Sequence, residues 1–132
     1  MILTASQIYA LARQAGFPPV VAVTMTAIAL RESSGNTAVA NDNAHTGDRS
    51  YGLWQINMFG ALKDKRLAQF GIANEMDLLD PAVNAAAAYR LWGGLNQNLG
   101  RAWYINRPGP YKAQYEKHLA AAQDAAINSP AT

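Results

Sequence analysis

The chain has 132 residues, of which 50% are hydrophobic and 15% charged, with a formal net charge of +2 and no cysteine. This length corresponds to one domain, and the composition is too apolar for a disordered chain. The lack of cysteine excludes a disulfide scaffold, a thiolate metal site and a cysteine nucleophile. The small positive excess forms no basic block, which argues against nucleic acid as a partner.

Two helices are predicted in the first third of the chain. Thr4 and Gln7 form the pattern of a capping box that opens a first helix, and Gly16 can end that helix. The second helix is predicted over Pro19–Leu30, where every side is apolar or small, as in a buried helix. Gly35 is the predicted terminator of this second helix.

The middle of the chain predicts irregular and extended structure. Asn36–Asp48 is polar and lacks periodicity, so we expect a loop there. The loose alternation in Tyr51–Ile56 predicts a short strand or hairpin. Leu62–Phe70 predicts a short helix with its apolar residues turned inward.

Two further helices are predicted toward the C-terminus. One begins at Asp80-Pro81 and ends at Gly93-Gly94, and the last runs from near Pro110 to about Ala126. The sequence therefore predicts a mainly α domain over residues 1–127, with a short β-hairpin or extended segment near 50–57 and a flexible tail at 128–132.

The sequence predicts neither a secretory signal nor a membrane-spanning helix. Met1–Gly16 lacks the unbroken apolar core of a secretory signal, so we expect no signal peptide. The most apolar stretch, Val20–Leu30, contains two threonines and is too short to span a bilayer.

Glu32 is the strongest candidate for acid–base chemistry. The chain has three glutamates, and the other two, Glu75 and Glu116, lie in polar surroundings and are expected at the solvated surface. Glu32 ends the most apolar helix, where burial and the helix dipole both raise the pKa of a carboxyl group. An acid still protonated near neutral pH can act as a general acid. The alternative is a solvated helix-end glutamate paired with Arg31.

The segments around Glu32 form a series of motifs. They are Glu32-Ser33-Ser34-Gly35-Asn36, then Ser50-Tyr51-Gly52-Leu53-Trp54-Gln55-Ile56-Asn57, then Leu79-Asp80-Pro81 with Asn84-Ala85-Ala86-Ala87-Ala88. In order and spacing they resemble the lysozyme-like superfamily, especially the soluble lytic transglycosylase (SLT) domains of bacteria and phage. The resemblance covers about Ala22–Trp92 well and the remainder loosely, and it implies a compact lysozyme-like fold.

The resemblance also implies roles for individual residues. Glu32 matches the catalytic acid and base of the family, and Ser33 matches the serine that helps to orient it. Gly52 would let the backbone pass close to substrate, where a Cβ would block it. Gln55 and Asn57 match polar groups that face the sugars, since amides donate to and accept from hydroxyl and N-acetyl groups. The alternatives are a strand bulge for the glycine and ordinary turn polarity for the amides.

The third element of the family, an Ala-Tyr-Asn-type segment, is not cleanly present. The nearest segment is Ala102-Trp103-Tyr104-Ile105-Asn106, followed by Pro108-Gly109-Pro110-Tyr111. Tyr104 or Tyr111 can hydrogen-bond near the acid or stack on a sugar. Trp103 and Tyr111 can equally be core aromatics, and Trp54 is open to either role.

The number of catalytic carboxylates decides between two reactions. The segment before Tyr51 also resembles animal-type lysozymes, in which an aspartate directly precedes the tyrosine; here Ser50 stands there, as a candidate substrate-binding residue. Asp48 becomes a second carboxylate if its loop turns inward, and otherwise serves the Gly47-Asp48 turn. Hydrolysis by the standard routes takes two carboxylates, so the missing aspartate favours the single-glutamate chemistry that the transglycosylase resemblance implies.

We therefore expect a lytic transglycosylase that cleaves the β-1,4 bond between N-acetylmuramic acid and N-acetylglucosamine in peptidoglycan. One alternative is a muramidase that hydrolyses this bond with Asp48 as second carboxylate. Another is a non-catalytic glycan-binding module of a virion. The expected partners are glycan strands and other virion proteins, without nucleic acid. The resemblance suggests a phage enzyme, virion-associated or released, that acts on the bacterial cell wall.

A metal site is a further alternative, because Asp42, His45 and Asp48 lie close together in the sequence. The run does not fit a calcium loop, since Leu53 stands where the bidentate glutamate belongs. Two histidines in the whole chain argue against zinc. We expect no metal and no cofactor.

Overall fold

The computed structural model describes residues 1–43, 45, 47–94, 103 and 110–129. This part of the chain is mainly helical with a small antiparallel sheet, which confirms the predicted fold class. In chain order the elements are α1 (Ala5–Ala15), α2 (Pro19–Ser33), β1 (Ala40–Asn43), β2 (Asp48–Tyr51), β3 (Ile56–Asn57), α3 (Leu62–Phe70), the 3-10 helix η1 (Glu75–Leu79), α4 (Pro81–Gly94), α6 (Pro110–Lys117) and α7 (Leu119–Ile127).

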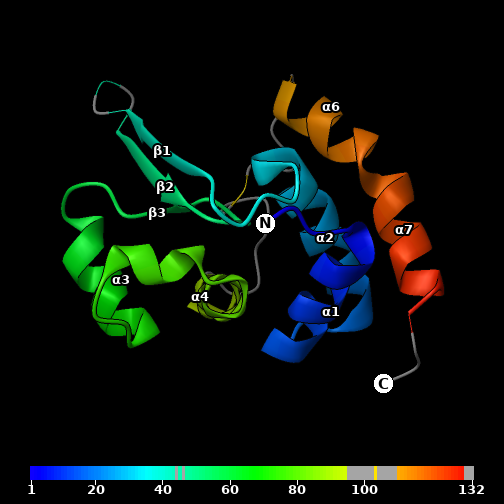
Figure 1. Ribbon diagram of the computed structural model, residues 1–132, viewed down its shortest axis with the longest axis horizontal. Coiled ribbons are helices and arrows are strands. Elements are labelled where there is room, and N and C mark those ends of the chain that lie inside the picture. The colour runs from blue at the N-terminus through cyan, green and yellow to red at the C-terminus, as the bar shows by residue number, and fades with distance from the viewer. Residues whose placement is uncertain (44, 46, 95–102, 104–109, 130–132) are drawn as a thin grey trace.

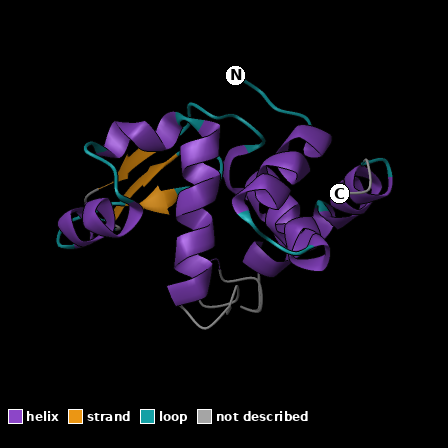
Figure 2. Cartoon of the chain, turned by 90° about the horizontal axis from the view of Figure 1, so that it is seen from below, coloured by secondary structure: helices purple, strands orange, loops and turns teal. Residues whose placement is uncertain are grey.

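Helix α4 lies between two groups of elements. The sheet and α3 lie on one side of it, and α1, α2 and α7 lie on the other (Figures 1 and 2). The contacts agree, because α4 packs against η1, α3 and β3 as well as against α1. Among the described residues, no helix has both the length and the apolar character needed to cross a membrane.

The first two helices form as their capping residues predict. The side chain of Thr4 accepts a hydrogen bond from the amide of Gln7, whose side chain accepts from the amide of Thr4 in return. Helix α2 begins at Pro19 and carries seven buried residues on a largely apolar surface. It ends at Ser33. The next residue, Ser34, lies just before the predicted terminator and caps the helix in a left-handed conformation, donating its amide to the carbonyl of Leu30.

The sheet differs from the prediction in its first strand. Residues 36–48 were expected to form a loop, but Ala40–Asn43 pairs with β2 in the register Ala40↔Tyr51 to Asn43↔Asp48. Every residue of β1 is exposed, so this edge strand has no buried face and no apolar alternation for the sequence to display. The predicted hairpin near 50–57 is present, with Ser50 opposite Asn57 across β2 and β3.

The turn between β2 and β3 is fastened to α4 by Asn84, which is fully buried. Its Nδ2 donates to the carbonyls of Tyr51 and Leu78, both at 2.8 Å, and its Oδ1 accepts from the amide of Trp54 at 2.9 Å. Gly52 lies directly against this amide group. A Cβ on Gly52 would be 2.4 Å from Nδ2 of Asn84 and 2.4 Å from the carbonyl oxygen of Leu78.

The last predicted helix is broken in two. The predicted span from Pro110 to Ala126 is interrupted at His118, whose amide bonds to the carbonyl of Tyr115 three residues earlier instead of four. Helix α4 ends at Gly94, within the predicted Gly93-Gly94 stop. Residues 130–132 of the predicted tail lie outside the described residues.

We expect Gly52→Ala to lower the free energy of unfolding by roughly 2–5 kcal/mol, because the added methyl group meets Asn84 and Leu78 and the residue has a left-handed φ of +76°. Gly71→Ala is the matched control, since Gly71 has a similar φ of +68° and nothing within 4 Å of an added Cβ. The control should lose only about 1–2 kcal/mol. Urea denaturation followed by circular dichroism measures both, and equal losses would contradict the steric role.

Candidate active site

Glu32 lies in the last turn of α2, and its side chain is 26% exposed. Burial is the largest influence on this carboxyl group and raises its pKa above the ordinary value. The guanidinium of Arg31 opposes that effect and lowers the pKa, while the negative charge of Asp48 raises it. The net direction is upward. Glu32 therefore has the property that the sequence predicted for it.

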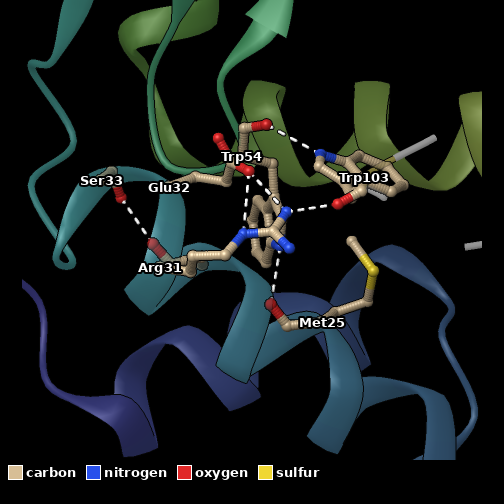
Figure 3. A network of polar contacts seen from close by, with 7 residues as sticks. Met25, Arg31, Glu32, Ser33, Trp54 and Trp103 are labelled. Atoms are coloured by element: carbon tan, nitrogen blue, oxygen red, sulfur yellow. Dashed lines mark hydrogen bonds and ion pairs between the residues drawn. The ribbon is translucent and has the colours of Figure 1, made fainter. Parts of the chain in front are cut away.

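Arg31 is the direct partner of Glu32 (Figure 3). Its side chain is only 2% exposed, and its Nε and Nη2 donate to Oε1 of Glu32 at 3.1 and 2.5 Å. Nη2 also donates to the backbone carbonyl of Trp103 at 2.6 Å. No hydrogen bond from the described residues engages Oε2 of Glu32, and Figure 3 shows that oxygen turned away from the guanidinium. The two carboxyl oxygens thus differ in their surroundings.

Trp54 and Trp103 connect this pair to the core. Trp54 is fully buried and donates its Nε1 to the carbonyl of Met25 in α2 at 2.8 Å. Trp103 is 5% exposed and donates its Nε1 to the carbonyl of Trp54 at 2.9 Å. Of the two roles left open by the sequence, the structure favours that of core aromatics for both tryptophans.

The structure gives Ser33 a partner within its own helix. Its hydroxyl is buried and donates to the carbonyl of Ala29 at 3.0 Å, so no hydrogen bond joins it to Glu32. Gly52, expected to allow close approach to a substrate, instead allows close approach to Asn84 and Leu78.

The two amides of the second motif hold the sheet together. Gln55 donates its Nε2 to the carbonyls of Val39 and Gly52 at 3.1 and 2.9 Å, and its Oε1 accepts from Asn41 at 2.6 Å. Gln55 also has a left-handed φ of +47°.

Asn57 is bound in the same way. Its Nδ2 donates to the carbonyl of Gly47 at 3.1 Å, and its Oδ1 accepts from the amides of Arg49 and Phe59 at 3.2 and 3.0 Å. Both side chains are therefore occupied by internal partners, as turn-forming residues are.

Asp48 and Ser50 lie together on one face of β2. They are two positions apart in a strand, so their side chains point to the same side. The hydroxyl of Ser50 donates to Oδ1 of Asp48. The charge of Asp48 acts on Glu32, as its contribution to the raised pKa shows. The strand therefore brings a second carboxylate into the electrostatic neighbourhood of the first.

Tyr104 and the side chain of Tyr111 lie outside the described residues. Within the described part of the chain, no group of three or more metal-binding side chains occurs. Asp42 pairs with Arg49 at 3.6 Å, and His45 is exposed.

Glu75 corrects a prediction, because it is not a solvated surface residue. Its side chain is 14% exposed and lies 3.8 Å from Arg49 and 3.9 Å from Lys63. Its charge and its hydrogen bonding to Tyr51 are among the causes that raise the pKa of that tyrosine, after burial. The polar composition around Glu75 does not reveal this, because the partners come from β2 and α3.

Sequence reasoning also missed Arg31 and Asn84 as positioning residues. The sequence alone presents Arg31 only as the neighbour of a helix-end glutamate. Its partner Trp103 is 72 positions away, so no local pattern signals the contact. Asn84 carried a usable signal, since a polar residue interrupts an otherwise alanine-rich helix.

The geometry agrees with comparisons to known proteins. Residues 9–100 match the family model described as a lysozyme like domain, and the chain belongs to that family. Membership supports a peptidoglycan-cleaving, glycosidase kind of activity in general. The chain is similar to Protein IpgF of Shigella flexneri and of Shigella sonnei, at 34% identity over 79 residues in each case. The match covers 60% of this chain and 49% of each relative, so the chain matches about half the length of those curated proteins. No solved structure matches the chain.

We expect Glu32→Gln to change how stability depends on pH. Because burial raises the pKa of Glu32 in the folded protein, the folded state binds this proton more tightly than the unfolded chain does. The resulting stabilisation is complete below the ordinary value of 4.5 and is lost as pH rises through the raised pKa.

The variant E32Q does not titrate at this position. Its free energy of unfolding relative to wild type should therefore increase between about pH 3 and about pH 7. Urea denaturation across this range measures the difference. A difference that falls with rising pH would mean that the folded state lowers the pKa of Glu32.

Proposed function

We propose that this chain cleaves the β-1,4 bond between N-acetylmuramic acid and N-acetylglucosamine in peptidoglycan as a lytic transglycosylase, with Glu32 as its single catalytic residue. The observation that carries the proposal is the carboxyl group of Glu32. Arg31 holds Oε1, Oε2 is free of hydrogen bonds from the described residues, and burial raises the pKa. Family membership supports the same class of substrate.

In the proposed reaction, Oε2 of Glu32 protonates the glycosidic oxygen and the bond from that oxygen to the anomeric carbon breaks. The carbonyl oxygen of the substrate's own N-acetyl group attacks the anomeric carbon and stabilises the developing charge. The carboxylate of Glu32 then removes the proton from the C6 hydroxyl of the muramyl sugar. The C6 oxygen attacks the anomeric carbon, displaces the N-acetyl oxygen and leaves a 1,6-anhydro end. The proton given to the leaving group equals the proton recovered, so neither water nor a second acid is consumed.

A raised pKa suits this cycle because Glu32 must first be protonated. Catalysis by a positioned acid is most efficient when its pKa lies near the operating pH. Arg31 prevents burial from making the group too weak an acid, since its positive charge stabilises the carboxylate that must act as base in the second half. The substrate partner in this proposal is the glycan strand of the bacterial cell wall, and the phage association expected from the resemblance remains part of the proposal.

A second candidate, hydrolysis by a muramidase, is favoured by Asp48. This carboxylate lies on the face of β2 that Ser50 shares, and its charge reaches Glu32. In a two-carboxylate route it would stabilise the sugar cation or activate water. Ser50 stands in place of the aspartate of animal-type lysozymes, which favours the single-glutamate route over this one.

We expect Glu32→Gln to reduce the release of dye from labelled peptidoglycan by about 10²- to 10⁴-fold, the usual contribution of a general acid. Glu116→Gln is the matched control, because Glu116 is an exposed residue of α6 paired with Lys112. It should retain full activity. Mass spectrometry of the wild-type products should show 1,6-anhydromuramyl ends.

Each other outcome of this experiment contradicts a defined part of the proposal. Reducing ends without anhydro products would identify a hydrolase. Activity that survives in E32Q would remove Glu32 from its catalytic role. A wild-type protein that sediments with cell walls but releases no glycan would be the non-catalytic binding module.

We expect Asp48→Asn to keep the anhydro products and to shift the alkaline limb of the kcat/KM profile to lower pH. The charge of Asp48 raises the pKa of Glu32, so removing this charge lowers it, and the alkaline limb reports the acid of the free enzyme. Asp124→Asn, an exposed residue of α7, is the control and should leave the limb in place. A loss as large as that of E32Q would instead support the two-carboxylate hydrolase.

A further inference from the structure

A chain of hydrogen bonds leaves α2 and returns to it through two tryptophans. Trp54 donates to the carbonyl of Met25 in α2, and Trp103 donates to the carbonyl of Trp54. The carbonyl of Trp103 accepts from Arg31, which donates to Glu32 at the end of the same helix. Figure 3 shows these contacts side by side. This chain of hydrogen bonds connects the last turn of α2, which carries Glu32, to the turn after β2 and to residue 103.

We propose that Arg31, anchored by the carbonyl of Trp103, is a positioning residue that gives the two oxygens of Glu32 separate tasks, holding Oε1 still so that Oε2 alone carries the transferred proton. This inference rests on the proposed function for its catalytic consequence. Its structural part, the control of Glu32 by Arg31, does not depend on activity. No tyrosine or second acid is needed for it.

The contacts of the guanidinium support this division. Nε and Nη2 both reach Oε1, so a rigid planar fork fixes that oxygen from two directions. An oxygen that accepts two such bonds is a poor place for a proton, whereas it can remain an acceptor whether the acid is neutral or ionised. Oε2 therefore both gives the proton to the leaving oxygen and takes one from the C6 hydroxyl, and the carboxyl group need not rotate between its acid step and its base step.

Arg31 has little else to hold it. Its side chain is 2% exposed, and its Nη1 is buried without a hydrogen-bond partner among the described residues. The described acceptors of this buried cation are thus Oε1 of Glu32 and the carbonyl of Trp103. Removing either one leaves a buried charge less compensated, which is costly. Trp103, held at its indole by Trp54, therefore limits where the guanidinium can lie.

Among the described residues, the charges that act on Glu32 are those of Arg31 on its own helix and Asp48 on β2. They act in opposite directions, the first stabilising the carboxylate and the second destabilising it. Removing the charge of Arg31 alone should therefore raise the titration midpoint of Glu32. A change that only loosened the fold would admit water and weaken the desolvation that raises the pKa, giving the opposite sign.

The decisive measurement is the titration of Glu32 by NMR in protein carrying ¹³C-labelled glutamate carboxyls. The chain has three glutamates, so three resonances are expected and the spectrum of E32Q identifies the one from Glu32. In Arg31→Met the midpoint of Glu32 should move to higher pH, because the stabilising charge is gone. In Arg31→Lys, which keeps the charge but not the planar fork, the midpoint should lie nearer to that of wild type.

Arg66→Met is the control for loss of another arginine, which is half-buried whereas Arg31 is buried. Arg66 donates its Nη1 to the carbonyl of Asn57 at 2.7 Å and does not contact Glu32. It should leave the midpoint of Glu32 unchanged even if the protein is less stable. Should Arg31→Met fail to fold, Arg31→Lys and Trp103→Phe, which removes the indole donor and keeps the carbonyl, provide the same test through smaller upward shifts.

Kinetics then separate positioning from structural support. Arg31→Lys should lower kcat by up to roughly 100-fold with a smaller change in KM, because the reacting oxygen is less well placed. In either Arg31 variant that retains activity, the alkaline limb of kcat/KM should follow the NMR midpoint upward. An unchanged or lowered midpoint in both Arg31 variants would overturn the inference. An upward shift in a protein that never cleaves peptidoglycan would uphold the positioning role and reject the proposed function.

Discussion

The contact between Arg31 and Glu32 is the interaction on which the proposed site depends. Burial at the end of α2 disfavours the ionised carboxyl group, and a neighbouring cation favours it. Neither influence alone suits a group that, in the proposed reaction, must give up a proton and then take one back. Burial alone would leave an acid too reluctant to ionise, and full pairing alone would leave a carboxylate unable to protonate a leaving group. The opposed effects keep both states within reach.

Three segments that are distant in the sequence meet at this contact: α2, the turn after β2, and residue 103. Hydrogen bonds from side chains to backbone carbonyls join them. The tryptophan indoles and the arginine fork all donate to carbonyl oxygens, of Met25, Trp54 and Trp103. Asn84 adds the same kind of bond between α4 and the turn after β2. Every residue has a backbone carbonyl that can accept a hydrogen bond. These connections therefore depend on the few side chains that donate, and the residues that supply only a carbonyl can change.

The helices and the candidate acid could be predicted because their signals are local. The capping box at Thr4, the proline at the start of α2 and the uniformly apolar surface of that helix are all readable within one segment. Strand β1 could not be predicted, since its residues are exposed on both faces and its pairing with β2 is tertiary. The same reason hid Glu75, whose compensating cations lie on two other elements.

Gln55 and Asn57, which match the lysozyme-like motif, have a structural role in the turns around β2. Both donor hydrogens of the Gln55 amide are used on the carbonyls of Val39 and Gly52, and the oxygen of Asn57 accepts two backbone amides. Their side chains therefore stabilise the turns that orient β2. On β2, Asp48 and Ser50 share one face of the strand, and their side chains are hydrogen-bonded to each other. A motif selected for turn geometry still marks the site, because the strand it orients faces the acid.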